Sequence, residues 1–215
     1  SKSSTSPSIT NRGRPVSDSA LRVAAPKTPG HLPGETGIWV FALTDLTVFT
    51  FYFVTFFYQR GQHPADFHAG AGHLSMMRGT VNTVALLTAS LFVALATQLV
   101  REGNTVRGRR LFGFAALCGA AFIVNKPFEW HHELAAGFGP HHDNFFQLYF
   151  MLTGLHLAHV LVAMVVLYFV IRASGQIGAG GVTPRHRRFI ENGATYWHLV
   201  DAIWLVLFAV FYLVR

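Results

Sequence analysis

The chain has 215 residues, of which 51% are hydrophobic and only 13% are charged, and its formal net charge is +7. Soluble domains of this size carry about 25% charged residues, so the composition indicates a membrane protein. The single cysteine, Cys118, excludes a disulfide framework within the chain.

The polar start of the chain differs from everything that follows it. Residues 1–37 are rich in Ser, Thr, Pro and Arg and lack apolar periodicity, which predicts a flexible leader. Apolar segments long enough to cross a bilayer as helices then follow at 38–58, 80–100, 111–130, 145–171 and 194–214. The sequence therefore predicts an all-α fold, a polytopic membrane helix bundle with five transmembrane helices over residues 38–215.

The distribution of Lys and Arg predicts the orientation of this bundle. The leader and the second and fourth connections lie on one side of a five-helix protein and hold 13 of these residues, against 4 on the other side. Because basic residues collect on the cytoplasmic side, we expect the N-terminus inside and the C-terminus outside the cytoplasmic membrane. The positive charge is thus a topology signal, and we expect no nucleic-acid partner.

Ionisable residues occur inside the apolar segments. Asp45, His159, His198 and Asp201 fall at a similar depth in the inner half of the membrane by helix-rise arithmetic. His156 lies three residues before His159, which places the two on one helix face. These side chains predict a structural hydrogen-bond cluster, a proton-handling or lipid-headgroup site, or a metal site. We expect at least one carboxylate to have a polar partner from another helix.

A second group of polar residues ends the third segment. Lys126 and Glu129 are three residues apart and could pair on the helix. Glu129 and His132 have the spacing of a di-iron motif, but those sites use two such motifs and the chain has one. Haem ligation by His156 or His159 with His198 is also physically possible. Seven further histidines toward the outer side are expected to be solvated loop residues, with weak metal binding left open: His63, His68, His73, His131, His132, His141 and His142.

Several of these segments resemble one family, the subunit III family of haem-copper oxidases. Residues 153–160, TGLHLAHV, are similar to its TGxHxxHV signature, and residues 196–204, YWHLVDAIW, to its terminal helix. Asp45 matches the acidic position of its first core helix, Asn82 its LNT motif, and Glu129 with Trp130 its glutamate–aromatic pair. Residues 34–41, GETGIWVF, resemble the start of members associated with nitric oxide reductase. The chain resembles the family's five-helix form.

The resemblance implies a subunit that carries no redox centre of its own. It implies haem and copper in a partner core subunit, contacts with subunits I and II, bound phospholipid, and a role in assembly, turnover stability and proton uptake. No cofactor or metal is expected on this chain. The competing functions are an accessory subunit associated with nitric oxide reductase, a stand-alone histidine-rich membrane metalloenzyme, and a small proton-coupled transporter.

Overall fold

The computed structural model describes residues 36–177 and 182–214, which form helices and no strand, so the predicted all-α class is confirmed. The predicted leader lies outside these residues except for its last two positions, where the first helix begins. The start of the nitric-oxide-reductase-like segment at Gly34 also lies outside them. The helices are α1 (Thr36–Gln62), α2 (Pro64–His73), α3 (Met76–Arg101), α4 (Thr105–Ala135), α5 (Asn144–Gly175), α6 (Pro184–Phe208) and a π-helical turn η2 (Ala209–Leu213).

Five of these helices are long and apolar enough to cross a membrane, as the sequence predicted: α1, α3, α4, α5, and α6 continued by η2. They are longer than the apolar segments because polar residues form their ends. The Asn104 side chain accepts a hydrogen bond from the Arg107 amide and caps α4. Thr183 caps α6 in the same way, and Pro184 occupies its first turn. The basic residues expected in these two connections therefore lie largely in helical turns.

The sequence did not predict α2, a short helix between α1 and α3. Its Phe67 packs against Phe56 of α1 and Phe145 of α5, with ring centroids 5.0 and 5.6 Å apart. Gly70 faces the same ring, because a Cβ there would overlap Phe145. The helix thus closes one end of the bundle with an aromatic contact.

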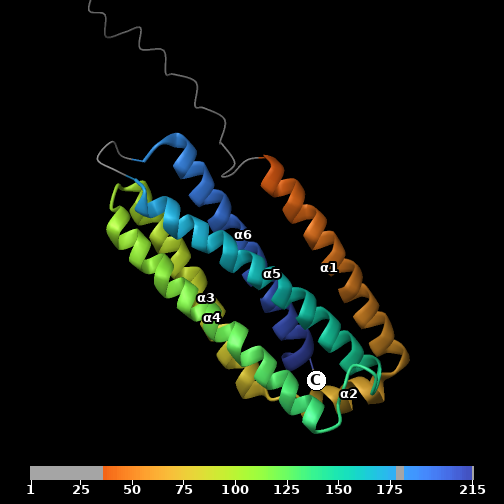
Figure 1. The fold of residues 1–215 in the computed structure, drawn as a ribbon. Helices are drawn as coiled ribbons and strands as arrows, with labels where there is room; N and C mark the ends of the chain where they lie inside the picture. The colour runs from red at the N-terminus through yellow and green to blue at the C-terminus, as the bar shows by residue number, and fades with distance from the viewer. Residues whose placement is uncertain (1–35, 178–181, 215) are drawn as a thin grey trace, which may run out of the picture. The chain divides into compact units, whose positions relative to one another are not determined.

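The packing of the long helices places α1 at one side of the bundle (Figure 1). Helices α3, α4, α5 and α6 pack against one another, whereas α1 contacts α5 and α6. Much of the α1 surface remains apolar and exposed, including Leu43, Phe51 and Val54. Such a surface is expected to face lipid or another membrane protein.

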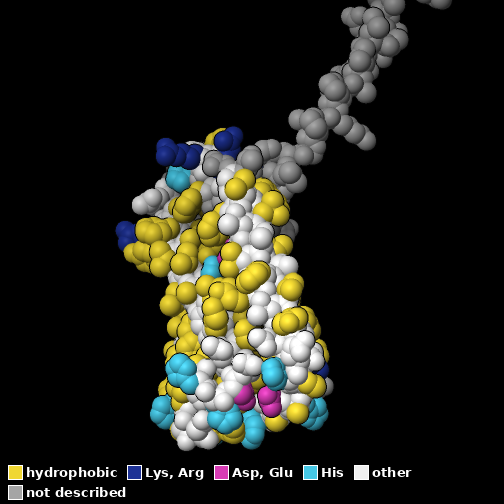
Figure 2. Space-filling model, turned by 90° about the vertical axis from the view of Figure 1, so that its right-hand side faces the viewer, with side chains coloured by type: hydrophobic (Ala, Val, Ile, Leu, Met, Phe, Trp, Pro, Cys, Tyr) yellow, Lys and Arg dark blue, Asp and Glu magenta, His cyan; other side chains and the backbone are white. Residues whose placement is uncertain are grey.

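The two ends of the bundle differ in charge (Figure 2). The end where α3 and α5 finish and α4 and α6 begin is called the basic end, and it carries Arg101, Arg107, Arg109, Arg110, Arg172, Arg185, Arg187 and Arg188. The opposite end carries the seven histidines and is called the histidine end. At the basic end Glu191 pairs with Arg101 at 2.8 Å and with Arg187 at 2.9 Å, which ties the end of α3 to the start of α6.

Candidate functional site: two buried polar pairs and an ion-pair network

Asp45 of α1 contacts His159 of α5. The carboxylate Oδ1 lies 2.8 Å from the imidazole Nε2, and Asp45 is only 8% exposed. The ring of Phe49, one helical turn along α1, covers the imidazole with its edge at a centroid distance of 5.5 Å. The expectation that a buried carboxylate meets a polar side chain from another helix is therefore confirmed at Asp45.

The hydrogen bonds of His159 define how many protons this pair holds. Its Nδ1 lies 2.7 Å from the carbonyl oxygen of Leu155, and a carbonyl only accepts, so Nδ1 carries a hydrogen. The remaining nitrogen faces Asp45 at 2.8 Å, a distance at which two lone pairs would repel. One proton therefore lies between Asp45 and His159, on the imidazole or on the carboxyl group. The pair has no net charge in either arrangement.

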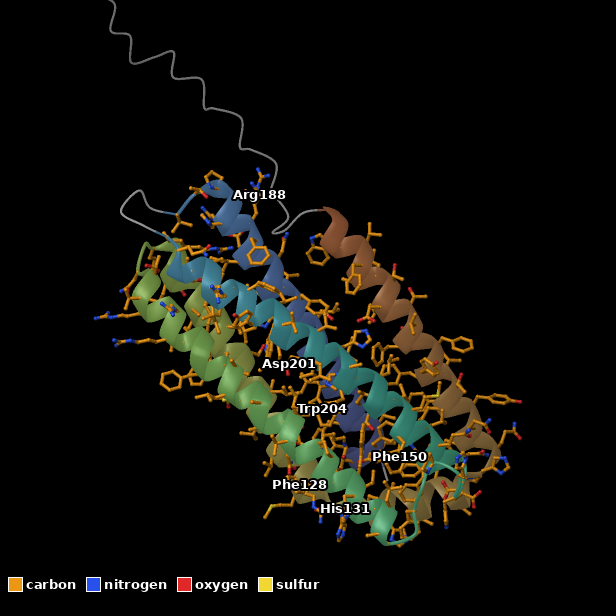
Figure 3. All side chains as sticks on the ribbon, in the orientation of Figure 1. Phe128, His131, Phe150, Arg188, Asp201 and Trp204 are labelled. Atoms are coloured by element: carbon orange, nitrogen blue, oxygen red, sulfur yellow. The ribbon has the colours of Figure 1, made fainter. Side chains whose placement is uncertain are left out.

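His198 and Asp201 of α6 form a separate pair with α3. The Ser90 hydroxyl lies 2.6 Å from His198 Nδ1, whereas Asp201 Oδ1 is buried without a hydrogen-bond partner among the described residues. The four residues expected at one depth are therefore not joined in one cluster of contacts, since Asp45 meets His159 and His198 meets Ser90. Helix-rise arithmetic gives depth along a helix but not the direction in which a side chain points. Figure 3 shows Asp201 and Trp204 on α6 between the two ends of the bundle.

His156 belongs to neither pair, although it lies one turn from His159. It is fully buried, and its ring packs against Phe122 of α4 and Trp204 of α6, at centroid distances of 5.7 and 5.3 Å. Neither ring nitrogen has a hydrogen-bond partner among the described residues. The two rings therefore meet different neighbours, and the structure shows no contact that joins His156 to the Asp45–His159 pair.

Lys126 and Glu129 of α4 pair as the sequence predicted, at 3.0 Å and with both side chains fully buried. The amine of Lys126 also donates to the hydroxyls of Tyr149 at 3.0 Å and Tyr212 at 3.1 Å. An ammonium group has three hydrogens to donate, so all three have acceptors.

Both carboxylate oxygens of Glu129 also accept hydrogen bonds from side chains other than Lys126. Both tyrosine hydroxyls donate to its Oε1, and Asn82 of α3 donates to Oε2 at 3.5 Å. Asn125 in turn donates to Asn82 at 2.6 Å. The network thus joins α3, α4, α5 and η2, and a buried ion pair survives in such a place only when its remaining hydrogen bonds are made.

Sequence reasoning found the charged members of this network and missed its tyrosines. Tyr149 and Tyr212 lie in segments rich in Phe, where an aromatic stripe reads as ordinary core. The tyrosines could have been predicted from the chemistry of Lys126, because a buried lysine needs more hydrogen-bond acceptors than one carboxylate supplies. His132, the second residue of the di-iron spacing, is exposed, whereas Glu129 is fully buried, so the two do not face one site.

The part of the chain that the structure describes contains no group of three or more His, Cys, Asp or Glu side chains arranged to hold a metal ion. Both ring nitrogens of His159 are engaged, by the Leu155 carbonyl and by Asp45, whereas Ser90 engages only Nδ1 of His198.

Comparison with known proteins identifies the family. The family model described as "Cytochrome c oxidase subunit III" matches residues 33–214. A cytochrome bo(3) ubiquinol oxidase subunit 3 of Pseudomonas aeruginosa is 29% identical, over 82% of this chain and 83% of the relative. A cytochrome c oxidase subunit 3 of Corynebacterium diphtheriae is 28% identical, over 90% and 93%. One from Synechocystis is 26% identical, over 86% and 81%. With its motifs distributed over five membrane helices, the chain belongs to the cytochrome c oxidase subunit III family.

Proposed function

We propose that the chain is the non-redox accessory subunit III of a haem-copper terminal oxidase in aerobic respiration. In this role it supports assembly, turnover stability and proton uptake of a core subunit that holds the haems and copper. Its partners are oxidase subunits I and II. The relatives described above include a subunit of a ubiquinol oxidase and a subunit of a cytochrome c oxidase. Both kinds of relative support a terminal oxidase as the complex to which this chain belongs.

The observation that carries the proposal is the one-proton pair of Asp45 and His159. A purely structural tie between α1 and α5 could be made by any two hydrogen-bonding side chains. This pair combines a carboxylate with an imidazole, a group that can donate to the carboxylate and can also take up a proton near neutral pH. Asp45 Oδ2 and the Tyr196 hydroxyl are both buried without a hydrogen-bond partner among the described residues. These free acceptor and donor atoms suit a pair that exchanges its proton with water.

The test compares Asp45→Asn with a matched variant of the same helix, Thr47→Val. Thr47 is exposed and bonds only to the Leu43 carbonyl of its own helix. In the purified oxidase complex, Asp45→Asn should retain the haem-bearing core subunit but take up protons more slowly during turnover. Thr47→Val should leave both properties unchanged. Normal proton uptake by an assembled Asp45→Asn complex would contradict the proton role.

The proposed orientation places the basic end in the cytoplasm and the histidine end outside. It is supported by the eight arginines at the basic end, which cytoplasmic ends of membrane helices favour. A reporter active only outside the cytoplasm should give a signal when fused after Arg215. The same reporter inserted between Glu102 and Asn104 should be silent, and the reverse pattern would overturn the orientation.

Bound phospholipid is also part of the proposal. An apolar groove of about 340 Å³ lies between α1, α5 and α6 and is lined by Phe41, Val162, Val166, Phe189 and Tyr196, among others. Its walls suit an acyl chain rather than a polar metabolite. Lipid retained by the purified complex, identified by mass spectrometry, should fall when Val166→Trp fills the groove.

A further inference from the structure

A second cavity lies away from this groove, at the basic end, between the first turns of α4 and the end of α5. Its volume is about 480 Å³, and its lining includes Arg109, Arg110, Val106, Ile171 and Ile177. It therefore combines two guanidinium groups with an apolar wall. Neither Asp45 nor the Lys126 network lines it.

The two arginines of this cavity have no acidic partner among the described residues. Arg101 and Arg187, by contrast, share the carboxylate of Glu191. Two uncompensated positive charges at one cavity favour an anion, and guanidinium groups bind phosphate oxygens in a two-point geometry that ammonium groups do not match.

Gly175, at the end of α5, positions one of these guanidinium groups. A Cβ at this residue would lie 3.1 Å from Arg109 Nη1 and 3.3 Å from its Cζ. The guanidinium can thus lie directly on the helix end only because residue 175 has no side chain. The cavity therefore depends on a close contact that a larger residue would disturb while leaving both charges in place.

The position of the cavity in the bundle indicates which kind of anion it binds. Helices α4 and α5 both reach their polar ends here, which is where the headgroups of a bilayer lie. Gly113 of α4 and Ile171 of α5 lie one helical turn deeper in the bundle than Arg109 and Gly175, so they offer apolar surface on the membrane side, which a free phosphate ion would not use. A phosphate group attached to acyl chains can contact both the arginines and the apolar residues of the lining.

We propose that this cavity binds the phosphate group of an anionic phospholipid, held by Arg109 and Arg110, with its acyl chains along Gly113 and Ile171. The proposal rests on the insertion of the bundle in a membrane and does not depend on the role proposed for Asp45. It assigns a lipid site at the α4–α5 end, separate from the groove beside α1.

The test measures phosphatidylglycerol binding to the full-length chain in detergent by native mass spectrometry, with phosphatidylcholine as the zwitterionic comparison. Arg109→Gln with Arg110→Gln should weaken phosphatidylglycerol binding about thirtyfold, since each arginine near anionic lipid contributes roughly one kilocalorie per mole. Arg107→Gln is the matched control, because Arg107 lies on the same helix, is exposed and does not line the cavity. It should bind phosphatidylglycerol as the wild type does.

Gly175→Val provides an independent arm, because it keeps both charges and displaces the Arg109 guanidinium. It should also weaken phosphatidylglycerol binding, with phosphatidylcholine binding and the thermal unfolding temperature unchanged. If Arg107→Gln weakened phosphatidylglycerol binding equally, the effect would come from overall charge, and the proposed site would be wrong. Displacement of phosphatidylglycerol by excess inorganic phosphate would overturn the lipid assignment in favour of a free-anion site.

Discussion

Replacing Lys126 by Met isolates the energetic role of the buried network. Methionine preserves the length of the side chain and removes its charge and its three donors. Glu129 then lies fully buried without its counter-ion, and breaking a buried pair in this way costs about 3–5 kcal/mol. The hydroxyls of Tyr149 and Tyr212 still donate to Glu129, which favours the lower part of that range.

The assay is unfolding of the purified full-length chain in mixed micelles titrated with dodecyl sulfate, followed by tryptophan fluorescence. Trp204 is a local reporter, because the amine of Lys126 lies 5.3 Å from the centre of its ring. Arg107→Met is the control, since it removes an exposed charge from the same helix and should change the free energy of unfolding by less than about 0.5 kcal/mol.

A double-mutant cycle with Glu129→Gln separates the ion pair from simple loss of packing. Either single variant leaves one buried charge alone, whereas the double variant is neutral and Gln still accepts from Tyr149 and Tyr212. The double variant should therefore be more stable than the sum of the two single effects by about 2–3 kcal/mol. Additive effects, or a Lys126→Met cost below about 1 kcal/mol, would refute the reasoning.

Two further substitutions test the packing around the polar groups. Gly79→Val places a side chain where Cβ alone comes within 2.7 Å of the Tyr212 ring, so it should lower the free energy of unfolding by about 1–3 kcal/mol. The control is Gly113→Val, where a Cβ meets open space, and it should lower the free energy of unfolding by less in the same assay. Ser90→Ala removes the hydroxyl bound to His198 and should lower the free energy of unfolding by about 1–3 kcal/mol; no change on this substitution would show that water replaces Ser90 at no cost.

The five membrane helices were predictable because apolar length alone specifies them. Their ends were not, since capping by Asn104 and Thr183 extended helices into segments that hydropathy treats as connections. Helix α2 was missed because ten residues with two glycines give no membrane signal, and its formation depends on Phe67 docking into the bundle.

One contact of the candidate site was predictable, and its other partners were less so. The family's acidic position at Asp45 and the histidine at His159 do meet. His198 turns instead toward Ser90, a residue that nothing distinguishes in an apolar segment. Which neighbour a polar side chain meets depends on the rotation of each helix about its axis. That rotation is determined by the packing of the whole bundle and is not encoded in any one segment.

The network around Lys126 also bears on the order in which the chain is made. Helix α4 carries Lys126, Glu129 and Glu133, and a charged residue near the centre of a single membrane helix costs roughly 2.5–3.5 kcal/mol to insert. The tyrosines that complete the network belong to α5 and η2, which leave the ribosome later. Before these tyrosines are made, Lys126 and Glu129 have each other and Asn82 of α3 as partners. The hydrogen bonds around the buried ion pair are therefore complete only after Tyr212 has been translated.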